Sequence, residues 1–130
     1  MVVIFIFSTT AFFLLQQTKQ PLPLVNGYLL RKPVSLPLFE LQDHQGQLFD
    51  HTSLLGNWHL IAYGYLTCPD ICPTTLLTLT HVAQQLKSES LAPEIKLIFY
   101  TVDPARDSST HLLQYLAYFN AEFIGLRASD

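Results

Sequence analysis

Two cysteines stand four positions apart in the stretch LTCPDICP, and they are the only cysteines of the 130-residue chain. Cys68 and Cys72 are each followed directly by a proline. A pair at this spacing can form a disulfide bond, cycle between dithiol and disulfide, or bind a metal ion. A disulfide here would close a very short loop and would restrict the unfolded chain little. The pair therefore indicates a chemical role rather than an architectural one.

The number of sulfur atoms narrows the kinds of metal site. Thiolates are soft ligands that suit Cu(I), whereas structural zinc and iron-sulfur sites normally use four protein ligands. With two cysteines in the whole chain, a zinc ribbon is disfavoured. The alternative without chemistry is that Cys68 and Cys72 are two small buried hydrophobic residues. Copper binding and thiol redox chemistry both remain open from the residues alone.

The segments around the cysteines predict how they are positioned. Residues 58–66, WHLIAYGYL, are aromatic and aliphatic with little polar alternation, which predicts a buried strand. Residues 73–90 carry leucines at three- and four-residue spacing, which predicts an amphipathic helix with Pro73 at its first position. Because proline disfavours helical backbone in the preceding residue, Cys72 is predicted to cap this helix. The unpaired N–H groups at the helix start would lower the pKa of a nearby thiol.

The remaining elements predict an α/β domain. Two short alternating runs around a turn ending in Gly46 predict a β-hairpin within residues 38–50. A second buried strand is expected at residues 94–103, a second helix beginning at Asp107 or Ser108, and a further strand from residue 122. Strands that alternate with helices indicate parallel pairing. Sites in such sheets lie beyond the carboxyl ends of the strands, where the cysteines are expected.

The amino-terminal third differs in composition from the rest. Residues 1–18 are predicted to form a membrane anchor, with a signal peptide as the alternative, because the first 15 residues are apolar apart from three hydroxyl side chains. Residues 19–35 are predicted to form a proline-rich tether, and residues 36–130 the folded domain. The net charge of -3 and the charged content of 13% argue against nucleic acid as a partner.

Two stretches together resemble one known family. Residues 64–76, GYLTCPDICPTTL, resemble the signature of the SCO/SenC family of copper-binding, thioredoxin-like proteins. Residues 100–126, YTVDPARDSSTHLLQYLAYFNAEFIGL, resemble the second block of that family. With the hairpin, the similarity covers residues 36–126, and two blocks at compatible spacing make it specific.

This resemblance implies a thioredoxin-like fold and a membrane-tethered protein that faces the bacterial periplasm or the mitochondrial intermembrane space. It implies a metallochaperone that carries copper, as Cu(I) or Cu(II), for assembly of the dinuclear copper site of cytochrome c oxidase subunit II or of another copper-site protein. The alternative is a thiol-disulfide oxidoreductase in which Cys68 and Cys72 are catalytic and reduce the partner's cysteines.

The ligand set and the chain length also follow from the resemblance. By it, Cys68 and Cys72 are the two sulfur ligands of copper, and the third ligand is a histidine expected beyond Asp130. The chain thus resembles a truncated member that lacks the closing strands and the last helix of the complete fold. A non-functional truncated product is therefore a further alternative.

Residues near the same sheet edge are secondary candidates. Asp103 is a candidate neighbour of the metal, while Arg106 and Asp107 are expected as turn, cap and ion-pair residues. Tyr63, Tyr65 and Phe99 are expected in the core.

The histidines offer one local candidate for a third ligand. His111 begins the second predicted helix and is the only histidine at the cysteine edge, whereas His59 and His81 lie too far away. His44 and His51 flank the hairpin and are expected to be solvated turn residues.

Overall fold

The structure of the chain, a computed structural model, describes residues 26–89 and 95–128. The chain divides into two compact units, Met1–Ser35 and Leu36–Asp130. The predicted membrane anchor at residues 1–18 lies outside the described residues. Of the predicted tether, residues 26–35 contain neither helix nor strand, and their side chains are exposed. Within the described ranges, no helix combines the length and apolar character needed to cross a membrane.

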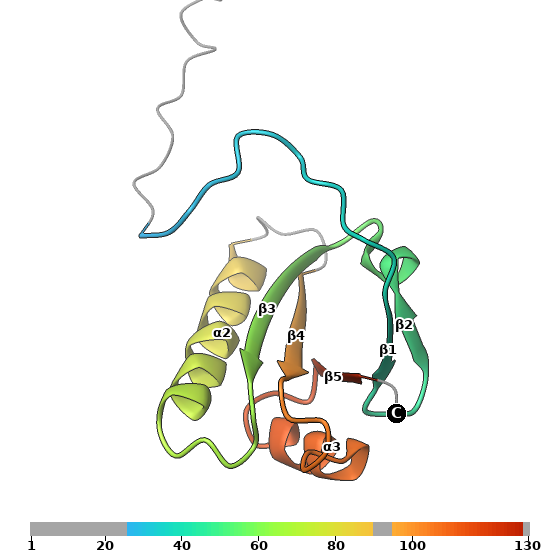
Figure 1. The fold of residues 1–130 in the computed structure, drawn as a ribbon. Coiled ribbons are helices and arrows are strands. Elements are labelled where there is room, and N and C mark those ends of the chain that lie inside the picture. The colour runs from blue at the N-terminus through green and yellow to red at the C-terminus, as the bar shows by residue number, and fades with distance from the viewer. Residues whose placement is uncertain (1–25, 90–94, 129–130) are drawn as a thin grey trace, which may run out of the picture. The chain divides into compact units, whose positions relative to one another are not determined.

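A five-stranded mixed sheet forms the centre of the second unit (Figure 1). Its strand order is β2-β1-β5-β4-β3. The parallel pairs β3–β4 and β4–β5 form one half of the sheet, and β1 joins the other half by pairing antiparallel with β5 and β2. The predicted parallel pair of strands is confirmed. The strands are β1 Glu40–Asp43, β2 Leu48–Asp50, β3 Trp58–Gly64, β4 Ile95–Thr101 and β5 Phe123–Ala128.

The predicted hairpin is confirmed in β1 and β2, and its turn chemistry is visible in the sequence. The Oδ1 atom of Asp43 accepts hydrogen bonds of 2.8 Å from the backbone N–H groups of both Gln45 and Gln47. Gly46 has a φ of 83°, a left-handed conformation that glycine adopts without a steric penalty. A 3₁₀ helix, η1 (His51–Leu54), follows β2 and is capped by the side chain of Asp50.

Two helices, α2 (Ile71–Ser88) and α3 (Ser109–Ala117), cover one face of the sheet (Figure 1). The apolar spacing predicted for the first helix is confirmed, because Leu76 and Ala83 are buried. Ser108 caps α3 by accepting a hydrogen bond from the N–H of His111. The helices and strands share one core, whose buried members are Ala62, Leu76, Ala83, Leu97, Phe99, Leu112, Leu116 and Phe123.

The opposite face of the sheet carries a second, smaller apolar cluster. Because side chains alternate along a strand, Ile98 of β4 points to this face while Leu97 and Phe99 point to the helices. Ile98 packs there with Phe49 and Leu126, so β4 is buried on both faces. Two parallel neighbours and two apolar faces explain why β4 reads as a continuous hydrophobic run.

Strand β3 differs from the prediction of a fully buried strand. It forms one edge of the sheet and pairs, among the described residues, with β4 alone. Ala62 is buried under the helices, but Ile61 and Tyr63 on the other face are 43% and 68% exposed. The sequence pattern could not distinguish β3 from β4, because both carry apolar residues on both faces.

The exposed edge and face of β3 predict self-association of the domain, because unpaired backbone groups beside apolar side chains favour edge-to-edge pairing. We expect residues 36–130 to form concentration-dependent oligomers in sedimentation experiments. The double substitution Ile61→Lys and Tyr63→Lys should reduce association, since charges on an edge strand oppose pairing. Leu77→Lys, at an exposed position of α2, should leave association unchanged. A monomeric parent domain at all concentrations would contradict this expectation.

Candidate functional site

The two cysteines lie where β3 passes into α2. Strand β3 ends at Gly64, and Cys68 lies in the connecting loop. The predictions for the helix start were wrong in detail: α2 begins at Ile71, Asp70 is its N-cap, and Cys72 is already helical. Pro73 occupies the third helical position, where the backbone N–H it lacks would have had no partner within the helix. The steric preference of a residue before proline is therefore overridden here.

The two sulfur atoms face each other and are both free thiols. The Cys72 thiol donates a hydrogen bond to the Cys68 sulfur, which also receives hydrogen bonds from the backbone N–H groups of Asp70, Ile71 and Cys72. These donors hold the pKa of Cys68 below the ordinary thiol value, with the bond from Cys72 the largest cause. The start of α2 therefore acts on Cys68, the residue in the loop, as an anion-stabilising group.

The pKa of Cys72 is shifted in the opposite direction, above the ordinary thiol value. Burial raises the pKa of its thiol, and its hydrogen bond to Cys68 and the charge of Asp107 raise it further. The exposed fractions of Cys68 and Cys72 are 8% and 7%, so access does not distinguish them. The pair is therefore arranged as one thiol with a lowered pKa beside a second thiol that serves as its hydrogen-bond donor.

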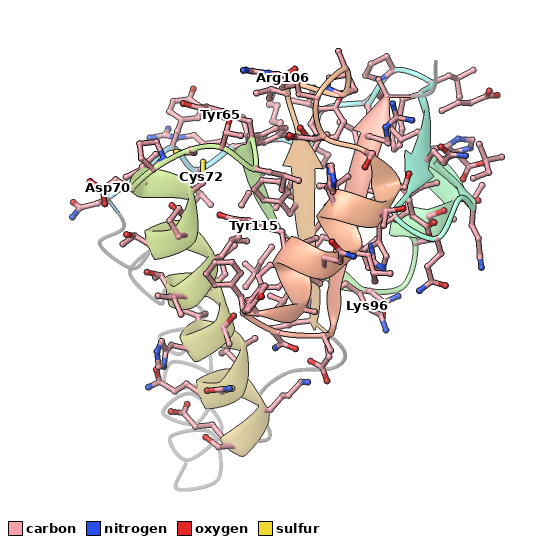
Figure 2. All side chains as sticks on the ribbon, turned by 90° about the horizontal axis from the view of Figure 1, so that it is seen from below. Tyr65, Asp70, Cys72, Lys96, Arg106 and Tyr115 are labelled. Carbon is pink, nitrogen blue, oxygen red and sulfur yellow. The ribbon has the colours of Figure 1, made fainter. Side chains whose placement is uncertain are left out.

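Gly64 at the end of β3 makes room for the second sulfur. A Cβ atom at Gly64 would lie 2.7 Å from the Sγ atom of Cys72 and 3.0 Å from the ring of Phe99. Any side chain at this position would push the sulfur or the ring out of place. Figure 2 shows Cys72 at the start of α2, close to the loop that leaves β3.

Tyr115 of α3 is a polar group directed toward the same region. It packs against the helix-side core, and its ring makes a tilted contact with Phe99 at a centroid distance of 6.4 Å. Its hydroxyl oxygen is buried and has no hydrogen-bond partner among the described residues. Burial raises the pKa of Tyr115, and the charges of Cys72, Cys68 and Asp107 add to the effect. The labelled side chain lies between α2 and α3 in Figure 2.

Asp103 and Arg106 form an ion pair on the loop between β4 and α3, as the sequence suggested. Arg106 is exposed and lies on the far side of the cysteine loop from α2 (Figure 2). Within the part of the chain that the structure describes, the side chain of Asp103 contacts Arg106. Asp107, expected as a turn or cap residue, is instead buried and binds the cysteine loop. Its burial was not visible in the sequence, because acidic residues before a helix are usually caps.

The histidines do not complete a metal site with the cysteines. Among the described residues, no group of three His, Cys, Asp or Glu side chains is arranged to hold a metal ion. His111 is exposed and lines a shallow pocket with Leu66 and Arg106. His44 lies in the turn as expected, but it is half-buried rather than fully solvated. Its Nδ1 atom accepts a 2.8 Å hydrogen bond from the N–H of Gly125 in β5.

The expectation of a core position was right for one of three aromatic residues. Phe99 is fully buried, whereas Tyr63 and Tyr65 are exposed. Tyr63 makes an edge-to-face contact with Tyr100 on the face away from the helices. Both tyrosines lie at the carboxyl end of β3, on the side of the molecule that carries the cysteine loop.

The site therefore contains two neighbouring sulfur atoms, which one metal ion could bridge or one disulfide bond could join. A soft monovalent metal fits this donor set, because both donors are sulfur atoms. The lowered pKa of Cys68 also favours the thiolate form, which is the form that binds metal ions. The same proximity allows a disulfide between Cys68 and Cys72.

Comparison with known proteins decides the family. The sequence profile described as SCO1/SenC matches residues 30–130. The chain belongs to the SCO1/SenC family. A SCO2-like protein of Rickettsia conorii is 40% identical over 92 residues, covering 71% of this chain and 44% of that protein. The mitochondrial SCO2 homologue of Homo sapiens is 37% identical, covering 70% of this chain and 34% of that protein.

A solved structure supports the fold of this SCO1/SenC chain. Yeast Sco1 with copper bound superposes with a TM-score of 0.70 and is 36% identical, covering 75% of this chain and 53% of that chain. The predicted thioredoxin-like α/β fold is thereby confirmed. The chain spans about half the length of that structure and less than half of the two relatives above.

The contact at Gly64 predicts a sensitive position. Gly64→Ala should lower the free energy of unfolding by ~1–3 kcal/mol, because the added methyl group overpacks the space of the Cys72 sulfur. Urea unfolding would measure the change. Gly27→Ala, where no atom lies within 4 Å of the added carbon, is the matched control and should be neutral. An equally stable Gly64→Ala protein would show that the sulfur moves freely.

The opposite pKa shifts predict an order of alkylation. A lowered pKa means that the thiolate persists to lower pH, so Cys68 should react with iodoacetamide at lower pH than Cys72. Peptide mass spectrometry after brief labelling between about pH 5 and pH 9 would follow both residues. Cys72→Ala should move the labelling of Cys68 to higher pH by removing its donor. Earlier labelling of Cys72 in the parent protein would refute the assignment.

Proposed function

We propose that this chain binds Cu(I) through Cys68 and Cys72 and serves as a copper-binding assembly factor. The observation that carries the proposal is the pair of buried sulfur atoms joined by a hydrogen bond at the start of α2. Membership of the SCO1/SenC family supports copper, since related structures were solved with copper bound.

Binding of Cu(I) would begin from the arrangement of the two thiols. Cys68 is held toward the thiolate form by the N–H groups at the start of α2, and it would bind the ion first. Cys72 would then release its proton and become the second ligand, so binding would release at least one proton. The third ligand is proposed to be a histidine, as the family resemblance implies, because the described residues offer no third ligand beside the two cysteines.

Delivery would proceed by exchange of ligands. A cysteine of the partner would replace one of the two sulfurs on the copper ion, and the second sulfur would leave after a second partner ligand binds. The proposed partner is the dinuclear copper site of cytochrome c oxidase subunit II, or another copper-site protein. The proposed location is a membrane facing the periplasm or the intermembrane space, with residues 1–18 as the anchor.

A thiol-disulfide oxidoreductase is the second candidate, and the lowered pKa of Cys68 favours it. In this reaction the Cys68 thiolate attacks a disulfide of the partner and forms a mixed disulfide. Cys72 then loses its proton and attacks Cys68, which releases the partner. Two electrons pass to the partner's disulfide, which becomes a dithiol, while Cys68 and Cys72 become a disulfide.

Competition with a chromophoric Cu(I) chelator tests the copper proposal. The reduced chain should bind one Cu(I), and Cys68→Ser or Cys72→Ser should each weaken binding by about tenfold or more, because a hydroxyl is a poor ligand for a soft ion. His111→Ala should leave the affinity unchanged, since this side chain belongs to no three-residue metal cluster in the described ranges. A reduced parent chain that leaves all the copper on the chelator would refute the proposal.

Trapping tests the redox candidate separately. If the chain reduces a partner, Cys72→Ser should accumulate a mixed disulfide through Cys68, because the resolving thiol is missing. Non-reducing electrophoresis with an oxidised copper-site peptide would detect it, and Cys68→Ser is the matched control. Absence of a trapped species, together with tight Cu(I) binding, would leave copper delivery as the function.

A further inference from the structure

One buried carboxyl group connects the cysteine loop to the rest of the sheet. The Oδ2 atom of Asp107 accepts a hydrogen bond of 3.1 Å from the N–H of Leu66 and another of 2.5 Å from the hydroxyl of Thr101. Asp107 is 2% exposed. A buried carboxyl group is costly unless hydrogen-bonded, so these contacts account for its position.

Thr101 fixes this carboxyl group to the end of β4. Its side chain is buried, and its Oγ1 atom accepts a 3.0 Å hydrogen bond from the N–H of Asp103. The single hydroxyl hydrogen of Thr101 is therefore directed to Asp107. The N–H of Asp107 in turn donates to the carbonyl of Asp103 at 3.0 Å. Asp107 is thus held from β4 and from its own loop.

Leu66 is the residue through which Asp107 holds the cysteine loop. It lies two residues before Cys68 in the loop after β3, and Leu66 is half-buried. Within the described loop there is one hydrogen bond between backbone groups, from the N–H of Cys68 to the carbonyl of Tyr65 at 3.2 Å. The bond from Leu66 to Asp107 therefore joins the cysteine loop to the β4–α3 connection, which is 41 positions away in sequence. Through the hydroxyl of Thr101, it also links the loop to the end of β4.

We propose that Asp107 is a positioning residue that holds the cysteine loop through the backbone N–H of Leu66, and thereby sets the placement of Cys68 opposite Cys72. The copper part of this inference rests on the proposed function. Asp103, the acidic residue that the sequence singled out, contacts Arg106, and in the described ranges its side chain makes no hydrogen bond to the cysteine loop. Asp107 and not Asp103 is the acidic support of the site.

Two substitutions of similar shape separate positioning from charge. Both hydrogen bonds reach one oxygen of Asp107, so the amide oxygen of Asp107→Asn can accept them both. Asp107→Leu has a similar volume and no acceptor. Ile98→Val, buried on the opposite face, serves as a destabilised control that does not touch the loop. Asp103→Asn tests the competing acidic residue.

Hydrogen exchange of the reduced, metal-free 130-residue chain is the first measurement. Asp107→Leu should speed exchange at Leu66 and Thr67 by about tenfold relative to Ile98→Val, because the loop can open without global unfolding. Asp107→Asn and Asp103→Asn should exchange as the parent does. Equal protection of Leu66 in Asp107→Leu and the parent would overturn the proposal. Should Asp107→Leu not fold, an unprotected Leu66 amide in the parent chain would overturn it equally.

Cu(I) affinity, measured against a chromophoric chelator, is the second measurement. Asp107→Leu should bind about 10-fold to 100-fold more weakly, as expected for loss of a group that orients a ligand. Asp107→Asn should bind within a few-fold of the parent, and an equal loss in both variants would assign the effect to charge and overturn positioning. If the parent chain binds no Cu(I), the proposed function fails while the exchange experiment still decides the role of Asp107.

Discussion

The approach of the start of α2 to the end of β3 is the constraint on which the site depends. At this junction the helix brings backbone N–H groups to one sulfur, and the missing side chain of Gly64 leaves space for the other. The sheet must therefore place β3 directly beneath α2, and the apolar face of the helix ensures it through Leu76 and Ala83. A parallel α/β architecture produces this geometry, because the chain passes from strand to helix at the carboxyl-end edge of the sheet.

The pKa values of the two thiols shift in opposite directions because the two cysteines occupy different places in the fold. Cys68 in the loop receives donors from the first turn of α2, whereas Cys72 inside that turn gives one and faces buried surroundings. Each has a proline after it, so the flanking residues do not show which thiol has the lower pKa. A pair in which one thiol has a lowered pKa and the other a raised pKa suits stepwise capture of an ion and also stepwise exchange of a disulfide.

Local patterns predicted most of the elements. Turn residues and alternation located the hairpin, leucine spacing located α2, and the run before Asp103 located β4. The wrong predictions about burial concerned residues whose surroundings depend on contacts between distant segments. The exposure of Tyr63 follows from the edge position of β3, and the bond between His44 and Gly125 joins residues 81 positions apart. The site cysteines were found from spacing, but Asp107 was expected to be a cap because burial is decided by the whole fold.

The sequence separation between Leu66 and Asp107 has a consequence for biogenesis. The two residues are 41 positions apart, so a growing chain presents both thiols well before it contains the carboxyl group that holds their loop. During that interval the loop that carries Cys68 lacks this support, which leaves both thiols more open to oxidants and to adventitious ions. A cell that makes this chain would benefit from keeping the newborn polypeptide reduced until β4 has docked.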